Sequence, residues 1–393
     1  MKKLKVHSLT GRITMPIMEA AFKSVKRNRG AAGLDKVSIE MFEANLEQNL
    51  VALMETLKSR TYEASPLRRH YIPKDGGKFR KLGIPSVRDR VAQEVIRQVI
   101  NPVFRKMFHE NSYGFIKGRN PHQAIERLLE LRDLGYVHVV DADEIEPDVP
   151  AGFFDNIPHG LIENTIAEEI ADGNVIKIIK QFLNCGVVED GKYIRTEMGT
   201  PQGGVISPLL ANIVLNKFDW ALEAQEFKFV RYADDFVILT KTSEAAERAL
   251  DFAITFLADI GLTLHPEKTK ITKFSIGFDF LGFTVNNRGA KMSEKSKKRF
   301  IDKIKKATIR SHNFDSEVIT ALNRIIRGTA NYFIKEFSTG YDSFRKFGRM
   351  VRRRIRCMKY TRISRDDNKK LRIKHIDKLG LIDIFKIYKS VRC

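Results

Sequence analysis

The segment "FKFVRYADDFVILT", residues 227–240, constrains the fold of this chain more than any other. Two runs rich in Phe, Val, Ile and Tyr flank a short Ala-Asp-Asp, which predicts two antiparallel strands joined by a tight turn. The flanks are apolar enough to bury the tip, and buried carboxylates without a partner are costly, so they usually bind a metal ion or pair with a cation. Asp also favours turns, and for an isolated motif an ordinary turn is the simpler interpretation.

Side-by-side carboxylates suit Mg²⁺, a hard cation that typically binds one or two carboxylates together with substrate phosphates. Two such ions about 4 Å apart can activate an attacking hydroxyl and stabilise a leaving pyrophosphate. A site of this kind usually needs a third acid on a neighbouring strand. The run "VVDADEIEPDVP", which begins inside the predicted strand "YVHVV", offers Asp141, Asp143 and Asp148.

The net charge of +21 is unevenly distributed along the chain. Residues 291–393 hold 30 Lys and Arg against 10 Asp and Glu, so they carry +20, whereas the other 290 residues hold 39 against 38. A field this one-sided needs a polyanionic partner, such as nucleic acid or an anionic membrane. The basic residues alternate with Phe, Tyr, Ile and Leu, as in "YDSFRKFGRMVRRRIRCMKY". We expect folded helices with a basic face that binds nucleic-acid phosphates.

Length and composition limit the other possibilities. A chain of 393 residues is expected to form two or three domains. No run approaches the roughly 18 apolar residues of a membrane helix, and the basic start "MKKLKVHSLTGRITM" lacks the apolar core of a secretion signal. Cys185, Cys357 and Cys393 form no CxxC pair, which suits a reduced cytosol and argues against a zinc module. We expect a cytoplasmic protein with no membrane partner.

Elsewhere the sequence predicts helices between antiparallel strand pairs. Helical spacing is found over residues 12–60, 86–109, 121–135, 153–183 and 243–260. "HYIP" and "FRKLGIP" flank a turn at Gly76-Gly77 and predict a second hairpin, Ser207-Pro208 starts a helix, and "FDFLGFTVN" is interpreted as one more strand. After residue 291 the pattern is helical only. The predicted fold class is therefore α+β, with a palm-like antiparallel sheet.

Six segments together resemble the blocks of bacterial group II intron reverse transcriptase/maturases, in the same order. They are "IPKDGGKFRKLGIPSVRDRVAQEVI", "NSYGFIKGRNPHQAI", "EMGTPQGGVISPLLANIVLNKFD", "RYADDFVIL", "GLTLHPEKTKI" and "FDFLGF". Any one alone would be weak, but together they are highly specific, and the similarity covers about residues 15–360. "RNRGAAGLDKVS" resembles the N-terminal extension of this lineage, and "GTANYF" with "FRKFGRMVRRRIR" is similar to the maturase thumb.

The resemblance implies a right-hand polymerase, with fingers and an antiparallel palm sheet followed by an all-helical thumb. We expect the N-terminal extension and fingers at 1–85 and the catalytic palm, with the remaining fingers, at 86–290. The helical thumb or maturase region would occupy 291–360, and a short basic extension would occupy 361–393.

The resemblance also implies roles for matching positions. Asp143, Asp234 and Asp235 would be the catalytic ligands of two Mg²⁺ ions. Lys74 and Arg80 would grip the triphosphate of the incoming dNTP, because phosphoryl transfer depends on positioning and charge neutralisation. The other substrate contacts would be Phe154 as a steric gate against a ribose 2′-hydroxyl, Gln202 and Gly203 under the nascent base pair, and Lys268 near the phosphates, with "FDFLGF" as the primer grip. Several of these roles have an ordinary alternative. Lys74 and Arg80 would be exposed hairpin charges, Phe154 a core aromatic and Lys268 a solvated lysine.

The identity of the third acid stays open. In the family, the first-strand aspartate is followed by two residues, a small residue, two aromatics and an Asp; here Asp143 lies six residues too far from Phe154, and Asp148 one too far. We favour Asp143, because it lies at the end of the strand "YVHVV" and the extra residues can bulge outward. Asp141 would share a strand face with Asp143 and is a weaker candidate. Alternatively, the insertion "EIEPDVPA" displaces the gate and lowers or abolishes activity.

The implied function is that of an RNA-directed DNA polymerase that transfers nucleotides from dNTP to a primer 3′-hydroxyl on an RNA template and also binds group II intron RNA. One alternative is a non-catalytic RNA-binding maturase, which primer extension in Mg²⁺ would distinguish. Another is a stand-alone reverse transcriptase of host defence, which intron RNA structure beside the gene would argue against.

Overall fold

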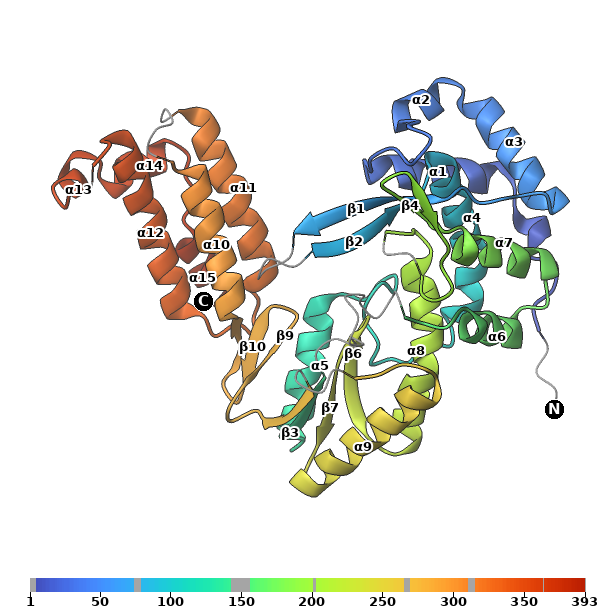
Figure 1. Ribbon diagram of the computed structural model, residues 1–393. Coiled ribbons are helices and arrows are strands. Elements are labelled where there is room, and N and C mark those ends of the chain that lie inside the picture. The colour runs from blue at the N-terminus through green and yellow to red at the C-terminus, as the bar shows by residue number, and fades with distance from the viewer. Residues whose placement is uncertain are drawn as a thin grey trace. The chain divides into compact units, whose positions relative to one another are not determined.

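The computed structural model describes residues 5–73, 79–142, 156–200, 203–264, 269–309, 315–362 and 364–392. The chain forms two compact units (Figure 1). The first unit comprises Met1–Ala124 and His138–Ile271, and the second unit comprises Ile125–Val137 and Thr272–Cys393. Each unit has its own hydrophobic core.

The N-terminal part of the first unit is helical, as its residue spacing predicts. Helices α1 (Met15–Arg27), α2 (Ile39–Ala44) and α3 (Leu46–Ser59) pack around α4 (Val87–Phe104). α4 is buried along most of its length, including the polar residues Asp89, Gln93 and Glu94. The hydroxyl of Tyr62 donates to Asp89 over 2.7 Å, so part of this burial is satisfied within the core.

The predicted second hairpin is confirmed. β1 (Leu67–Pro73) pairs antiparallel with β2 (Phe79–Ile84), and the glycines expected at its turn lie outside the described residues. β1 also pairs in parallel with β4 (Val187–Glu189), which pairs with β5 (Lys192–Ile194). The resulting sheet has the order β2-β1-β4-β5.

The hairpin that carries the paired aspartates belongs to a separate sheet. β6 (Lys228–Tyr232) and β7 (Asp235–Thr240) are antiparallel, and β7 also pairs antiparallel with β3 (His138–Ala142). With β8 (Thr269–Lys273) the order is β6-β7-β3-β8. Helix α8 (Ser207–Ala224), which starts at Ser207-Pro208 as predicted, packs against β6, and α9 (Ser243–Asp259) packs against β3 and β7. The turn between β6 and β7 therefore joins two strands that pack against α8 and α9.

Three further helices match the predicted helical spacing: α5 (Pro121–Asp133), α6 (His159–Glu169) and α7 (Gly173–Asn184). Asp172 caps α7, accepting from the backbone N–H groups of Asn174 and Val175. Asp172 also accepts from the backbone and hydroxyl of Thr10, so one side chain joins α7 to the N-terminal segment.

The prediction of a single strand over "FDFLGFTVN" is wrong. This segment forms two antiparallel strands, β9 (Phe278–Phe280) and β10 (Phe283–Asn286), and β11 (Gly289–Met292) completes a sheet of order β11-β10-β9. Leu281 and Gly282 form the turn with φ values of 51° and 79°. Two positive φ values in succession are typical of the tightest hairpin turns, and a leucine at the first position hides that signal in the sequence.

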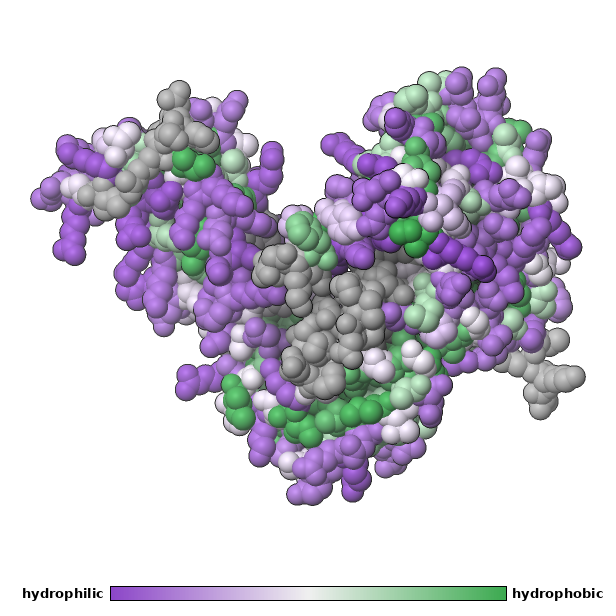
Figure 2. Space-filling model, viewed as in Figure 1, coloured by the Kyte–Doolittle hydropathy of each residue, from purple (hydrophilic) through white to green (hydrophobic). Residues whose placement is uncertain are grey.

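The part of the second unit that follows β11 is a helical bundle. Its helices are α10 (Glu294–Ala307), α11 (Ser316–Phe333), α12 (Tyr341–Lys359), α13 (Asp367–Lys370), α14 (Ile373–Lys378) and α15 (Ile384–Arg392). The core includes Phe300, Ile326, Phe344 and Ile355. Figure 2 shows hydrophilic side chains over most of the visible face of these helices. The α+β fold class and the helical C-terminal region are confirmed, whereas the boundaries at 85, 290 and 360 stay a prediction.

Candidate active site and nucleic-acid interface

Two adjacent carboxylates lie at the turn between β6 and β7. Ala233 and Asp234 form the turn, and Asp235, the first residue of β7, pairs with Tyr232. Both aspartates are half-buried. Ala233 has a φ of 59°, a left-handed conformation that glycine adopts more readily than alanine. The turn therefore holds two carboxylates in a conformation that its own sequence does not favour.

A third carboxylate lies on the neighbouring strand. β3 pairs with β7 so that Asp141 opposes Val237 and Ala142 opposes Phe236. Because side chains alternate between the two faces of a strand, Asp141 shares a face with Val237 and Asp235. Asp141 is buried, and its Oδ2 lies 3.5 Å from the exposed Nζ of Lys270. The residue that we rank as the weaker candidate thus lies on the same sheet face as Asp235.

Several of the expected site residues lie outside the described residues: Lys74, Asp143, Asp148, Phe154, Gln202 and Lys268. The described site residues are Arg80, Gly203, Asp234 and Asp235. Within the ranges that the structure describes, no cluster of three or more His, Cys, Asp or Glu side chains is arranged to hold a metal ion. The expected aspartate trio is only partly included in those ranges, because Asp143 is not among them.

Arg80 lies on the β1–β2 hairpin, and Gly203 lies against that hairpin. Arg80 is exposed on β2, opposite Ile72. Gly203 has a φ of 109°, and a Cβ atom there would lie 2.7 Å from the carbonyl oxygen of Gly83 on the same strand. The backbone N–H of Val205 donates to Oε1 of Gln93 over 2.7 Å. Glycine is therefore required at 203 by its backbone angle and by the close approach of β2.

A buried ion pair, which was not predicted from the sequence, is hydrogen-bonded to the aspartate turn. Arg231 on β6 is 1% exposed and Asp219 on α8 is 0% exposed. The Nε and Nη2 atoms of Arg231 donate to the two carboxylate oxygens of Asp219 over 2.7 and 2.5 Å. Nη1 of Arg231 donates to Asn212 and to the carbonyl oxygen of Ala233, each over 2.8 Å. The available signal was a charged residue inside each of two otherwise buried runs.

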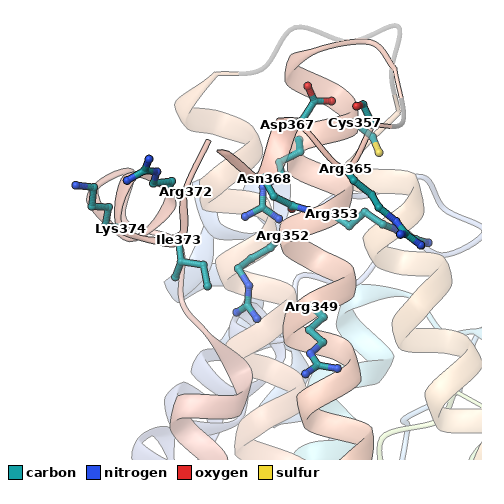
Figure 3. Close-up of a pocket in the computed structure, with 12 residues that line it drawn as sticks. Arg349, Arg352, Arg353, Cys357, Arg365, Asp367, Asn368, Arg372, Ile373 and Lys374 are labelled. Carbon is teal, nitrogen blue, oxygen red and sulfur yellow. The ribbon is translucent and has the colours of Figure 1, made fainter. Parts of the chain in front are cut away.

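The second unit contains a cationic cavity of about 880 Å³ beside α12 (Figure 3). Its lining comes from α12, α14 and the segment that contains α13, and consists of Arg349, Arg352, Arg353, Arg356, Cys357, Ser364, Arg365, Asp367, Asn368, Arg372, Ile373 and Lys374. Seven of these twelve side chains are basic and one is acidic. We call this site the arginine pocket.

Some cations of the arginine pocket have protein partners. Arg352 pairs with Asp383 over 2.7 Å, and Nε of Arg356 donates to the carbonyl oxygen of Leu371 over 2.9 Å. Burial, followed by the nearby charge of Arg352, lowers the pKa of Arg356. The one acid, Asp367, pairs with Arg362 over 3.0 Å.

The other five cations of the arginine pocket are the side chains of Arg349, Arg353, Arg365, Arg372 and Lys374, which form no hydrogen bond or ion pair across the described ranges. An unpaired cluster of this kind in a cavity attracts anions, and arginine matches phosphate geometry well.

Comparison with known proteins identifies the class to which this chain belongs. A family model described as reverse transcriptase (RNA-dependent DNA polymerase) matches residues 72–285. A second model, the group II intron maturase-specific domain, matches residues 297–378. The chain therefore belongs to the group II intron reverse transcriptase/maturase family and contains an RNA-directed DNA polymerase domain.

Two curated relatives agree with this assignment. The chain is 32% identical over 331 residues to Protein YkfC of Escherichia coli (strain K12), with 74% of this chain and 86% of the relative covered. It is 28% identical over 419 residues to the group II intron-encoded protein LtrA of Lactococcus lactis subsp. cremoris, with 81% and 68% covered. Among solved structures, a chain of the partial Cas6-RT-Cas1–Cas2 complex is 24% identical to this chain, with a TM-score of 0.39. The aligned part covers 63% of this chain and 41% of that chain.

None of the helices within the described ranges combines the length and the apolar character needed to cross a membrane.

Proposed function

We propose that this protein copies RNA into DNA, adding dNTP units to the 3′-hydroxyl of a primer, and that it binds intron RNA. The observation that carries the polymerase proposal is the half-buried aspartate pair at the β6–β7 turn, inside the segment that the reverse transcriptase model matches. The maturase-specific match over 297–378 and the arginine pocket support the RNA-binding proposal.

The donor set fits Mg²⁺, because the turn offers hard carboxylate oxygens that are partly withdrawn from water. We propose Asp143, Asp234 and Asp235 as the ligands. Asp143 directly follows Ala142, and Ala142 pairs with Phe236, the residue after Asp235. When bound, two Mg²⁺ ions would supply the positive charge that stabilises phosphoryl transfer. Asp148 is the alternative third acid, and Asp141, on the same face as Asp235 but paired with Lys270, is a weaker candidate.

The other substrate contacts follow the family roles. Arg80, exposed on β2, and Lys74 would bind the dNTP triphosphate. Gln202 and Gly203 would lie under the nascent base pair. The backbone angle of Gly203 and the close approach of Gly83 support a tightly packed backbone at this position. Phe154 would exclude a ribose 2′-hydroxyl, Lys268 would lie near the phosphates, and the β9–β10 hairpin would grip the primer.

The proposed subdomains are the N-terminal extension and fingers at 1–85, the catalytic palm with the remaining fingers at 86–290, the helical thumb or maturase region at 291–360 and a short basic extension at 361–393. The arginine pocket draws on the last two, since α12 lies before residue 360 and α13 and α14 lie after it. We propose that the pocket binds phosphates of structured intron RNA. Its unpaired cations would contribute a strong dependence of affinity on salt, because each neutralised phosphate releases counterion.

The decisive experiment is primer extension on an RNA template in Mg²⁺ with the wild-type chain and Asp235→Ala. Extension by the wild type but not by Asp235→Ala supports the proposal. Asp251→Ala, which changes an exposed acid on α9, is the matched control and should extend like the wild type. If all three are inactive while the protein binds intron RNA with salt-sensitive affinity, the function is that of a non-catalytic maturase, which the arginine pocket would still serve.

A further inference from the structure

The turn that carries Asp234 needs outside support. Ala233 precedes it with a φ of 59°, and an alanine in this left-handed region is strained and persists only when its surroundings enforce it. A metal ligand must also be held within a few tenths of an ångström, because Mg²⁺ demands near-ideal octahedral geometry. Two sets of neighbouring groups fix Ala233.

The first support is the hydrogen bond from Arg231 to the carbonyl group of Ala233. Nη1 of Arg231 donates to that oxygen over 2.8 Å, while the rest of the guanidinium is held by Asp219. Asp219 is held in turn by the hydroxyl of Ser112, which donates to its Oδ2 over 2.5 Å. The side chains of Arg231, Asp219 and Ser112 are at most 1% exposed, so none can relax by turning to solvent.

The second support is the backbone of residues 111–114. The backbone N–H of Arg231 donates to Asn111 over 2.9 Å, and that of Tyr113 donates to Arg231 over 2.8 Å. A Cβ atom at Gly114 would lie 2.3 Å from the backbone nitrogen of Ala233. Asn212 joins the two supports, because it accepts from Arg231 and donates to the carbonyl oxygen of Gly114.

We propose that Arg231, Asp219, Asn212 and Gly114 are positioning residues for the reaction, which set the backbone of the aspartate turn and thereby the metal affinity of Asp234 and Asp235. The inference rests on the proposed function, since it concerns the same ligands. Stability alone would not require this arrangement, because a buried ion pair can often be replaced by apolar residues without loss. A purely stabilising role does not explain why the guanidinium of Arg231 donates to the carbonyl oxygen of Ala233.

The first test compares Arg231→Lys and Arg231→Met with the wild type in the full chain. Both variants lack the planar fork that reaches Asp219 and Ala233 together. We expect the Mg²⁺ concentration for half-maximal primer extension to rise about 10- to 100-fold, as for other residues that orient metal ligands. Mn²⁺ binding followed by electron paramagnetic resonance, without nucleotide, should weaken in the same proportion. Arg97→Met, which breaks the Arg97–Glu94 pair on α4, is the control for loss of a buried charge partner.

The second test leaves every side chain of the network in place. Gly114→Ala should push the turn away, because the added methyl group has no room beside Ala233. A displacement approaching 1 Å should lower kcat by about 100-fold. Gly160→Ala is the matched control, since a Cβ atom at 160 meets nothing within 4 Å, and it should keep the wild-type kcat and Mn²⁺ affinity.

Two results would overturn the positioning role: Arg231 variants that bind Mn²⁺ like the wild type and differ only in melting temperature, or Gly114→Ala with full kcat. The metal readout separates this inference from the polymerase proposal. If the wild type binds Mn²⁺ but extends no primer, and Arg231→Lys binds Mn²⁺ more weakly, the positioning role stands and the polymerase function fails.

Discussion

Arginine has opposite roles at the aspartate turn of the first unit and in the arginine pocket of the second unit. In the first unit, Arg231 is 1% exposed and gives its donors to Asp219, Asn212 and Ala233. In the second unit, Arg353 and Arg365 line a cavity and form no ion pair across the described ranges. A buried charge is tolerated only when it is paired and hydrogen-bonded, so the first kind fixes a backbone turn. An unpaired, solvated charge remains available to an outside anion, so we propose that the second kind binds a ligand.

The same contrast applies to the acids. Asp234 and Asp235 are half-buried at a turn, where carboxylates stay accessible from solvent while part of their hydration is lost. In the arginine pocket the one acid, Asp367, is 1% exposed and paired with Arg362, so it offsets little of the positive field of the cavity. Chemistry and phosphate binding are therefore expected to be separable by mutation.

The largest separation should come from the aspartate turn. Asp234→Asn or Asp235→Asn should lower the rate of primer extension by at least about 1,000-fold, since loss of a metal ligand removes several kcal/mol of charge stabilisation. Affinity for intron RNA should stay near that of the wild type. Single-turnover extension and filter binding on the same preparation measure both quantities. Normal extension by either variant would remove the pair from the site.

The third ligand can be assigned by an equally large effect. Asp143→Ala should be as inactive as Asp235→Ala, whereas Asp148→Ala should keep most activity, because a ligand needs a rigid element and Asp143 directly follows β3. Shortening residues 144–151 to two residues should preserve or raise activity. An inactive Asp148→Ala beside an active Asp143→Ala would transfer the role to Asp148, and an inactive Asp141→Ala alone would transfer it to Asp141.

The arginine pocket should give a smaller effect of a different kind. Arg349, Arg353 and Arg365 changed together to Gln should weaken RNA binding for all sequences alike. The slope of log affinity against log salt should fall by about 0.7 to 0.9 for each phosphate that the variant no longer neutralises. Lys23, Lys58 and Lys106, exposed in the first unit, changed together to Gln are the control of equal charge. A slope that falls equally in both triple variants would show that net charge matters and the pocket does not.

The smallest predicted effect concerns two neighbours on α12. Arg354 donates to the hydroxyl and carbonyl oxygens of Thr308 and so caps the end of α10, whereas Arg353 is exposed in the arginine pocket. Arg354→Gln should lower the free energy of unfolding by about 1 to 3 kcal/mol, because the variant cannot form these charged hydrogen bonds. Arg353→Gln should leave stability unchanged and weaken RNA binding. Denaturant titration and salt-dependent binding of both variants check the contrast, which an equal loss of stability would contradict.

Much of the fold could be predicted from local pattern. The β6–β7 hairpin, the helix that begins at Ser207-Pro208 and the helices after residue 291 all follow from short-range periodicity and turn chemistry. The division at Leu281-Gly282 was missed, because leucine gives no sign of the positive φ that it adopts there. Turn conformation at a non-glycine residue depends on what packs around it.

The class of this protein follows from its amino-acid sequence, because the motif order, the paired aspartates and the one-sided charge can all be found along the chain. Which charges hold the protein together and which face outward depends on how the helices and strands pack. Arg352, Arg353 and Arg354 are adjacent and alike, but helical rotation turns them to Asp383, to the arginine pocket and to Thr308. Arg231 meets Asp219 only because α8 packs against β6. An arginine carries the same charge at every position in the sequence. Its role depends on whether packing places a partner or solvent beside it.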